Sequence, residues 1–345
     1  MEATPKEQPK EPPKAVPPAF IVSIGPHMRT EDSTAKIMWT VNAALLPATL
    51  MSVYYFGMPA IMVIVVCIIT SLLAEAGMQK LLKKPVTLSD GSAFLTGLLL
   101  AMNLPAKVPL YIPFVGSIVA IMIAKHLFGG LGYNIFNPAL IGRAFVLVSF
   151  AKIMTTFTQP VANIMSMDAK TMATPLTVLK EDGLAKLIEL YPNIHRDLLM
   201  GNRAGSLGET ATIALLLGAA FLMIKRYITW HIPVTFIATV GVLAWMFGGK
   251  GPLFTGDPIF HMMSGGLILG AFFMATDYVT GPSVRNAQIV FGICAGALTM
   301  LIRLKGGYPE GVMFAILLMN CFAPLLDRGM RSRVFGKAEA KGVKK

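Results

Sequence analysis

Charged residues are scarce in this chain. They make up 14% of its 345 residues, whereas a soluble domain usually contains about 25%. With 54% hydrophobic residues and a mean hydropathy of +0.64, the composition excludes an ordinary soluble globular protein. It also excludes a disordered chain, which is much less apolar. The composition is typical of a protein that crosses a membrane several times.

Cysteine and acidic residues are also few. The 3 cysteines lie inside apolar runs without CxxC spacing, which excludes a disulfide framework and predicts no zinc or iron–sulfur site. Acidic residues number 18 against 30 Lys and Arg. Much of this excess follows the last apolar run, in residues 328–345. A basic stretch in that place indicates a cytoplasmic flank rather than a nucleic-acid surface.

Apolar runs recur along the whole chain. A helix that spans a bilayer needs about 20 mainly apolar residues. Ten segments approach that length, and the shortest are expected to be broken or re-entrant helices that line a cavity. In order, they are 36–56, 59–79, 92–104, 111–128, 136–150, 209–224, 231–248, 259–276, 286–303 and 312–326. The sequence therefore predicts an all-α polytopic membrane protein with about ten transmembrane helices.

The distribution of Lys and Arg predicts the orientation of these helices. Ten spans put both termini on one side, and short cytoplasmic connections are enriched in basic residues. With both termini in the cytoplasm, the inner connections carry Lys80, Lys83, Lys84, Lys125, Lys225, Arg226 and Arg285. The outer connections carry Lys107, Lys250, Arg303 and Lys305. We therefore predict a prokaryotic cell-membrane protein with cytoplasmic termini and an extracytoplasmic connection over residues 151–208.

Two stretches of the chain resemble each other. They are GSAFLTGLLLAMNLP (91–105) and SGGLILGAFFMATDY (264–278). Each lies in a group of five spans, and the odd number would invert the second group relative to the first, as in many transporters. Chance similarity between glycine-rich helices is the alternative. The predicted organisation is a flexible N-terminal segment (1–34), a five-helix repeat (35–158), an extracytoplasmic loop (159–208), a second five-helix repeat (209–327) and a basic tail (328–345).

The end of the long loop has a possible phosphate site. In GSLGE (205–209), Gly205, Ser206 and Glu209 lie where the next predicted span begins. Glycines and a hydroxyl at a helix N-terminus leave backbone N–H groups available to a phosphate. The alternative is an ordinary helix cap in which Glu209 complements the helix dipole.

The start of the loop carries a more specific pattern. Residues 168–174 read DAKTMAT and resemble the flavinylation motif D-G-x-S/T-G-A-T, with Ala169 and Met172 in place of glycine. The matching residues are Asp168, Thr171, Ala173 and Thr174. Further motifs follow the same order as in a known family: FNPALIGRAF (136–145), GSLGE, FFMATD (272–277) and YPEGVMFAILLMNCFAPLLD (308–327). Together they resemble the RnfD/NqrB family from about residue 35 to 333, and the short N-terminus and the ATPL sequence favour its RnfD branch.

The resemblance implies both the cofactors and the activity. Thr174 would carry FMN through a phosphoester that a separate flavin transferase makes, and a second, non-covalent flavin (riboflavin or FMN) would also be bound. The chain would be a redox-driven translocase subunit of the Rnf complex, which couples electron transfer between ferredoxin and NAD to Na⁺ or H⁺ transport. Its partners would be an FMN-bearing G-type subunit, iron–sulfur subunits and small membrane subunits. The alternatives are an NqrB-type subunit of a Na⁺-translocating NADH:quinone reductase and a flavin-free transporter or channel.

Two further sets of residues are candidates for the flavin sites. GYNIFNPA contains Asn134 and Asn137. The resemblance favours Asn137 as a contact of the second flavin, and the alternative is a helix cap before a proline. Lys170 and Arg203, in the loop, are candidate cations beside an isoalloxazine ring, where positive charge would favour the reduced flavin.

Carboxylates at the ends of spans are candidates for a cation pathway. Asp90, Asp277 and Asp327 all map to the predicted inner side, and Glu75 is a further candidate. An acid within a membrane segment is by default a functional candidate, and a carboxylate can hold Na⁺ or a proton. The resemblance associates Asp90 and Asp327 with cation uptake. The alternative is solvation at the interface or pairing with Arg143, Arg285 or Arg328.

Overall fold

The computed structural model describes residues 32–160, 171–209, 212–249 and 253–330. By its internal contacts the chain divides into Met1–Ser33 and Thr34–Lys345, and only the second unit is described further. The predicted N-terminal segment and most of the basic tail therefore lie outside the described residues.

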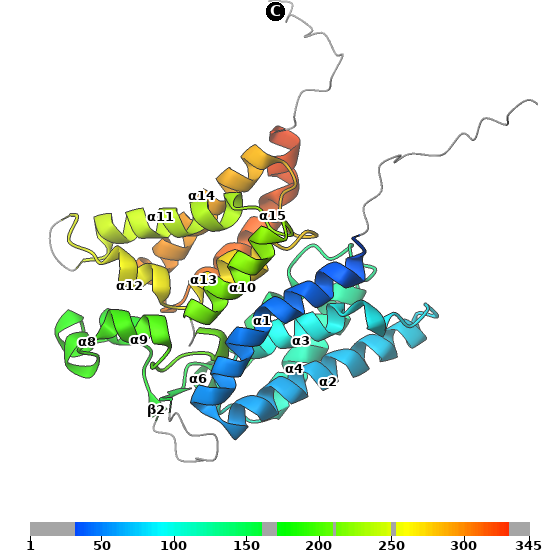
Figure 1. Ribbon diagram of the computed structural model, residues 1–345, viewed down its shortest axis with the longest axis horizontal. Helices are drawn as coiled ribbons and strands as arrows, with labels where there is room; N and C mark the ends of the chain where they lie inside the picture. The colour runs from blue at the N-terminus through cyan, green and yellow to red at the C-terminus, as the bar shows by residue number, and fades with distance from the viewer. Residues whose placement is uncertain (1–31, 161–170, 210–211, 250–252, 331–345) are drawn as a thin grey trace, which may run out of the picture. The chain divides into compact units, whose positions relative to one another are not determined.

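The first half of this unit is helical (Figure 1). Two long helices are followed by shorter pieces, and one of these pieces is a π-helix. In order, the elements are α1 (Thr34–Phe56), α2 (Met58–Leu81), η1 (Leu88–Asp90), α3 (Ser92–Met102), α4 (Tyr111–Ile118), the π-helix η2 (Val119–His126) and α5 (Pro138–Ser149).

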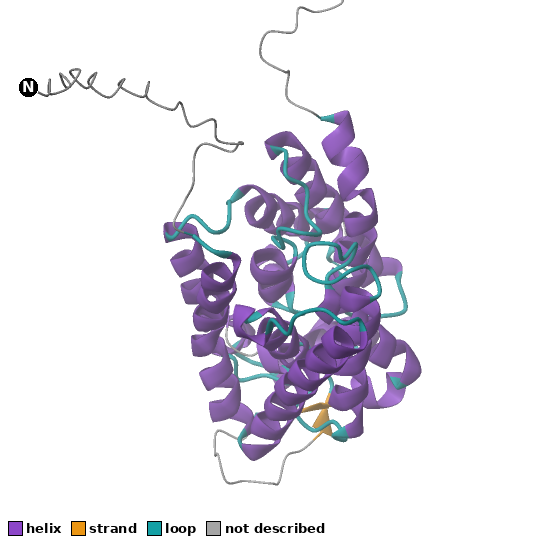
Figure 2. Ribbon diagram, turned by 90° about the vertical axis from the view of Figure 1, so that its right-hand side faces the viewer, coloured by secondary structure: helices purple, strands orange, loops and turns teal. Residues whose placement is uncertain are grey.

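The connection between the halves contains short helices and a small antiparallel pair of strands (Figure 2). Strand β1 (Phe157–Thr158) pairs with β2 (Thr171–Met172), and Thr158 lies opposite Thr171. The other elements here are α6 (Ala151–Met154), α7 (Pro175–Glu181), α8 (Leu184–Leu190), α9 (Ile194–Met200) and η3 (Leu207–Glu209).

The second half again combines long helices with broken ones. Its elements are α10 (Thr212–Ile224), α11 (His231–Phe247), α12 (Pro258–Met263), α13 (Leu267–Leu269), the π-helix η4 (Gly270–Met274), α14 (Arg285–Lys305) and α15 (Val312–Gly329). Each of the ten predicted segments thus contains a helix. The segment predicted at 259–276 is divided among α12, α13 and η4.

Among the residues that the structure describes, four helices are long and apolar enough to cross a bilayer, namely α1, α2, α14 and α15. The other apolar helices, such as α3 and α5, are shorter. A polar backbone can end within a membrane only where protein or water satisfies it. The structure is therefore that of a polytopic helical membrane protein whose short helices must end against other parts of the protein.

Glycines with positive φ set the starts of the broken helices. Gly91 (φ 74°) precedes α3, and Gly265 and Gly266 (φ 68° and 64°) precede α13. Glycine adopts this backbone conformation without the steric cost that a side chain brings. The two stretches that resemble each other in sequence therefore begin with the same kind of turn.

The two halves pack through helices that are far apart in sequence. Helix α2 packs against α3 and α4, α11 packs against α14, and α1 packs against α10. A Cβ placed on Gly218 of α10 would overlap the Ala44 carbonyl oxygen of α1, so only glycine permits this approach. Most buried apolar side chains of both halves form one continuous cluster.

The helices define two ends of this unit. The terminal end is where α1 begins, and it includes Ile37 and Asp277, which line one cavity. The loop end is where α1 finishes, and there Tyr55 Oη donates a hydrogen bond to Met200 O of α9 (2.7 Å). Helices α7 to α9 form a small apolar cluster with Phe260 of α12 at this loop end.

Candidate functional site

A cavity of about 90 Å³ lies at the terminal end, between the two halves of the chain. Residues of α1 and α3 line one side of it, and residues of α10 and η4 line the other. Its polar and charged lining residues are Ser92, Thr96, Lys125, Asn134, Asn137, Thr276 and Asp277. The structure therefore brings both predicted asparagines to one cavity, together with one of the predicted carboxylates.

Asn137 links the two halves at this cavity. Its Oδ1 accepts hydrogen bonds from Ala139 N (3.1 Å) and Leu140 N (3.4 Å), so it caps α5. Its Nδ2 donates to Met274 O of η4 (3.4 Å). The expectation of a helix cap is confirmed. The neighbouring Asn134 is buried and donates to Phe136 O (3.1 Å).

The three predicted aspartates all hold turns at the terminal end. Asp90 Oδ1 accepts from the backbone N–H (2.9 Å) and the hydroxyl (2.8 Å) of Ser92, at the first turn of α3. Asp277 accepts from Thr280 Oγ1 (3.0 Å). Asp327 accepts from Ser283 N (2.9 Å) just before α14. Each carboxylate thus orders a connection through hydrogen bonds to its neighbours.

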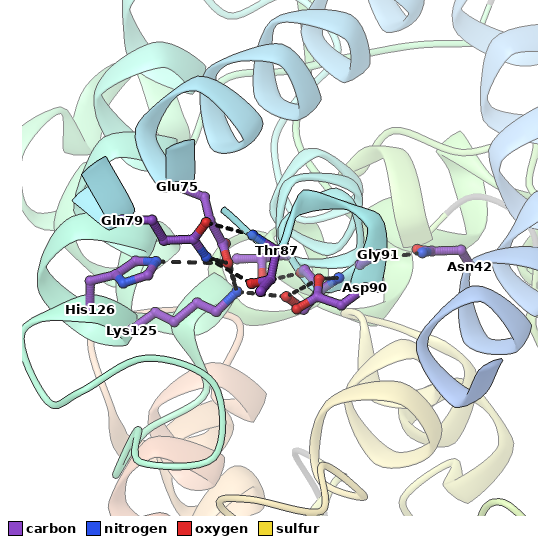
Figure 3. A network of polar contacts seen from close by, with 10 residues as sticks. Asn42, Glu75, Gln79, Thr87, Asp90, Gly91, Lys125 and His126 are labelled. Atoms are coloured by element: carbon purple, nitrogen blue, oxygen red, sulfur yellow. Dashed lines mark hydrogen bonds and ion pairs between the residues drawn. The ribbon is translucent and has the colours of Figure 1, made fainter. Parts of the chain in front are cut away.

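A buried ion pair lies beside Asp90, as Figure 3 shows. Lys125 Nζ contacts Glu75 Oε2 (2.6 Å) and Oε1 (2.8 Å) and donates to Ser92 Oγ (2.7 Å). Both charged side chains are 2% exposed. Gln79 Nε2 donates to Glu75 Oε1 (3.2 Å). Since an unpaired buried charge is costly, these contacts fix the ends of α2, α3 and η2 together.

Two basic residues lie elsewhere than the sequence predicts. The charge pattern assigns Lys125 to an inner connection and Arg303 to an outer connection, but both are buried inside the protein. Periodicity could not reveal this, because each falls at the end of an apolar run. A basic residue near such an end can either face the membrane interface or turn inward to buried acceptors. For Lys125, the acid Glu75 within an apolar run was the sequence feature that could have indicated a buried partner.

The flavinylation motif lies at the loop end and is only partly described. Thr171 belongs to β2, Ala173 is exposed, and Asp168 and Lys170 lie outside the described residues. Thr174 is the N-cap of α7, and its Oγ1 accepts from Thr177 N (3.3 Å). The threonine therefore ends an extended segment and begins a helix.

The residues around Thr174 are held by the small cluster of α7 to α9. Tyr191 Oη contacts Met172 Sδ at 3.5 Å, which links the end of α8 to the motif strand. Burial raises the pKa of the Tyr191 phenol, so this side chain stays neutral. Lys180 at the other end of α7 donates to Gly306 O (2.5 Å) and Tyr308 O (3.2 Å). Helix α7 is thus attached to the connection between α14 and α15.

The GSLGE stretch is buried at the loop end. Leu207 N donates to Leu104 O (3.0 Å), so the stretch docks on the end of α3. Ser206 Oγ donates to Glu209 Oε1 (2.7 Å). A Cβ on Gly208 would lie 2.8 Å from Met102 O. Gly205 is buried as well. The residues predicted to bind phosphate are thus packed closely against the end of α3.

Two buried arginines, Arg203 and Arg303, and the partly buried Arg143 lie close to this stretch. Arg203 Nη2 donates to Glu209 O (2.6 Å) and Met263 O (2.8 Å). Arg303 donates to His261 O (2.6 Å) and Ser264 O (2.7 Å), just before the turn that starts α13. The charge of Arg203 is therefore directed at backbone carbonyls. The structure does not direct it toward Thr174, where the sequence predicts a flavin.

The third arginine forms the clearest ion pair of the loop end. Arg143 Nη2 lies 2.5 Å from Glu310 Oε2, and the two side chains are 11% and 14% exposed. Arg143 Nη1 donates to Asn103 Oδ1 (2.7 Å) at the end of α3. This pair joins residues 167 positions apart, and sequence reasoning did not predict it.

A second cavity of about 610 Å³ lies between the loop helices and the second half. Its lining includes Leu176 and Leu179 of α7, His261 of α12 and Arg303 of α14. Helix α7, which begins after Thr174, forms part of the cavity wall. The cavity volume falls in the usual range for ligand pockets, roughly 300–1,000 Å³.

Comparison with known proteins places this arrangement in a family. The model of the NQR2, RnfD, RnfE family matches residues 21–336, which is most of the chain. The chain belongs to this family. The resemblance to the RnfD/NqrB family that the sequence motifs indicated is therefore confirmed.

Relatives of this NQR2, RnfD, RnfE family member come from several bacteria. The D subunit of the proton-translocating ferredoxin:NAD(+) oxidoreductase complex of Clostridium ljungdahlii is 52% identical over 320 residues, which are 92% of this chain and 96% of the relative. The D subunit of the Na(+)-translocating ferredoxin:NAD(+) oxidoreductase complex of Acetobacterium woodii is 45% identical, with 93% and 96% covered. The D subunit of the ion-translocating oxidoreductase complex of Aliivibrio salmonicida is 37% identical, with 92% and 99% covered.

The Arg143–Glu310 pair gives a test of the loop end. Replacing Arg143→Leu leaves Glu310 buried without its partner, and the loss of one member of a buried pair costs about 3–5 kcal/mol. We expect a correspondingly lower free energy of unfolding in detergent, measured by chemical denaturation. The double variant Arg143→Leu/Glu310→Gln should recover part of that loss.

The exposed pair Lys186–Asp182 (3.4 Å) is the matched control. Replacing Lys186→Met should change the free energy of unfolding by less than about 1 kcal/mol. If Arg143→Leu and Glu310→Gln lower the free energy of unfolding by amounts that simply add in the double variant, the two residues do not stabilise the fold as a pair.

Proposed function

We propose that this chain is the D subunit of an ion-translocating ferredoxin:NAD oxidoreductase complex of the Rnf type. The observation that carries the proposal is the identity of 52% and 45%, over more than nine-tenths of the chain, to two relatives that carry that name. In this role the chain is a redox-driven translocase subunit that works within a multisubunit complex. The polytopic helical architecture supports the assignment to a cell membrane.

The proposal includes an orientation and a set of partners. Both termini would be cytoplasmic, and residues 151–208 would face the other side. With Lys125 and Arg303 removed from the count because they are buried, basic residues still favour the predicted inner connections by six to three. The partners would be an FMN-bearing G-type subunit, iron–sulfur subunits, small membrane subunits and, during maturation, a flavin transferase.

The inverted repeat is part of the same proposal. Helix α2 packs on α4 in the first half as α11 packs on α14 in the second. Glycine turns with positive φ precede α3 and α13, which are the helices whose sequences resemble each other. These correspondences support two five-helix repeats whose broken helices meet at the cavity between the halves.

Covalent FMN is proposed on Thr174. The residue follows the motif positions Thr171 and Ala173, and it caps α7 at the loop end. Esterification at Oγ1 would leave an oxygen lone pair, so the hydrogen bond from Thr177 N can persist. The place at a helix start suits a phosphate, and because Thr174 is 3% exposed, an attached FMN requires neighbouring side chains to move aside.

The second, non-covalent flavin is proposed for the cavity at the terminal end. Asn134, Asn137 and Asp277 supply polar groups, and Phe272 and Phe273 supply aromatic surface, which fits the chemistry of an isoalloxazine ring. The cavity of about 90 Å³ is smaller than an ordinary ligand pocket. A flavin-sized occupant therefore requires side chains at the rim to move aside.

The residues and the flavins would divide the work. When bound, the two flavins supply the electron-carrying groups at opposite ends of the subunit. The chain's own residues bind and orient them: Thr174 at the loop end, Asn137 at the terminal end. The helices between them keep water and competing reactions away from the path.

The cation pathway is a proposal for the carboxylates of the terminal end. Asp90, Asp277 and Asp327 all lie there, close to the cavity or to the connections beside it. The relatives from Clostridium ljungdahlii and Acetobacterium woodii are named for protons and for Na⁺ respectively, and a carboxylate can serve either ion. Coupled NADH formation measured with and without Na⁺ distinguishes the two for this chain.

Covalent attachment is tested by Thr174→Ala. Because the ester oxygen would be lost, we expect the fluorescent flavin band of this chain to disappear from a denaturing gel when the flavin transferase is co-expressed. Thr156→Ala is the control, since Thr156 is an exposed threonine of the same connection and should leave the band intact. A wild-type chain without the band would favour the flavin-free transporter.

The second site is tested by Asn137→Ala. The substitution removes a cavity amide, and we expect at least a tenfold loss of the flavin that acid releases from the purified complex, while the covalent band remains. Asp257→Ala is the matched control, because Asp257 caps α12 by accepting from Phe260 N (3.1 Å) and lies outside the cavity lining. Both substitutions lose an N-cap at a cost of about 0.5–2 kcal/mol. Equal flavin loss in the two variants would contradict the proposed site.

The NqrB-type alternative is separated by the partners that co-purify. Iron–sulfur subunits and ferredoxin-dependent NAD reduction support the Rnf assignment. A purified complex that reduces quinone with NADH would overturn it.

A further inference from the structure

Lys125 has an unusual place at the terminal-end cavity. It lies in the π-helix η2, is 2% exposed, and lines the cavity. Its Nζ contacts both carboxylate oxygens of Glu75 and Ser92 Oγ, and Ser92 itself lines the cavity. Glu75 does not belong to that lining. The ion pair is therefore oriented with its cationic member at the cavity and its anionic member behind.

The charge at the cavity wall comes from few residues. Among the described residues that line it, the charged ones are Lys125 and Asp277. Asp277 accepts from Thr280 Oγ1 and Val279 N, so it is engaged in its own turn. Glu75 is held in turn by Gln79 (Figure 3). The geometry leaves Lys125 as the fixed positive group that an occupant of the cavity would experience.

The sequence suggested two other cations for a place beside a flavin. Arg203 donates to Glu209 O and Met263 O at the loop end, and Lys170 lies outside the described residues.

We propose that Lys125 sets the redox preference of the cavity, whose occupant becomes more negative on reduction, and that Glu75 limits the strength of this effect. The inference rests on the proposed binding of a non-covalent flavin there. An electron that arrives without a proton adds one negative charge to such an occupant, and no bond is made or broken. The electron comes from the neighbouring carriers of the complex. Charge interactions are strong in a buried site because little water screens them, so Lys125 favours the reduced form.

Lys125 would act through its charge on the midpoint potential of the occupant. The charges of Lys125 and Glu75 predict the direction in which each substitution shifts that potential. Removal of Lys125 takes the positive charge from the cavity wall, whether Glu75 stays ionised or binds a proton, and disfavours reduction. Removal of the Glu75 charge leaves Lys125 unopposed and must favour it. A residue with a merely structural role would not shift the midpoint potential in opposite directions in these two variants.

The test is a potentiometric titration of the acid-releasable flavin in the purified complex. The variants are Lys125→Met, Glu75→Gln and the double variant, and Lys80→Met is the control because Lys80 is exposed on the same helix as Glu75. We expect Lys125→Met to lower the equilibrium constant for one-electron reduction at least tenfold, which lowers the midpoint potential by about 59 mV. Glu75→Gln should raise the potential, and the double variant should fall between Lys125→Met and wild type.

The double variant also keeps the test decisive if Lys125→Met fails to fold, because it buries no unpaired charge. A bound flavin whose potential is the same in all four variants would overturn the role of Lys125 while leaving the flavin site intact. A wild-type complex without acid-releasable flavin would instead overturn the proposed site, and this inference with it.

Discussion

The requirement that buried charges be paired shapes both ends of this protein. An unpaired charge among apolar helices costs several kcal/mol, so each buried cation must reach an acid or backbone oxygens. At the terminal end, Lys125 reaches Glu75 and the first turn of α3. At the loop end, Arg303 reaches the carbonyls just before the turn that starts α13. In each half, therefore, a cation near the end of a long helical segment fixes the start of a broken helix.

Fixing these broken helices also defines the space between the halves. The starts of α3 and α5 and the π-helix η4 border the same cavity, and Asn137 bonds across it to Met274 O. A cavity lined mainly by apolar groups, with a few polar ones, is the usual form of a small-molecule site. The loop end differs, since Thr174 begins a helix that is attached from outside through Lys180 and a small apolar cluster. One end thus surrounds a cavity, and the other holds Thr174 at a helix start where its side chain is buried.

Local patterns in the sequence predicted much of this fold. Hydropathy located the ten helical segments, and the asparagine before Pro138 predicted the cap of α5 that the structure has. The division of segment 259–276 and the antiparallel β1–β2 pair were not predicted, since both depend on contacts with other parts of the chain. The pairs Lys125–Glu75 and Arg143–Glu310 join residues 50 and 167 positions apart. Periodicity carries no information on such distant contacts, so the charge pattern alone assigns Lys125 to a connection. The prediction that Thr174 carries a flavin rests on family motifs, because a helix N-cap alone gives no sign of a cofactor.

The most direct test is an experimental density map of the whole complex at a resolution that shows bound cofactors. We predict flavin density between Asn137 and Lys125 at the terminal end, and FMN density continuous with Thr174 Oγ1 at the loop end. A terminal-end cavity filled by lipid or by repacked side chains, in a complex that retains electron transfer, would contradict it.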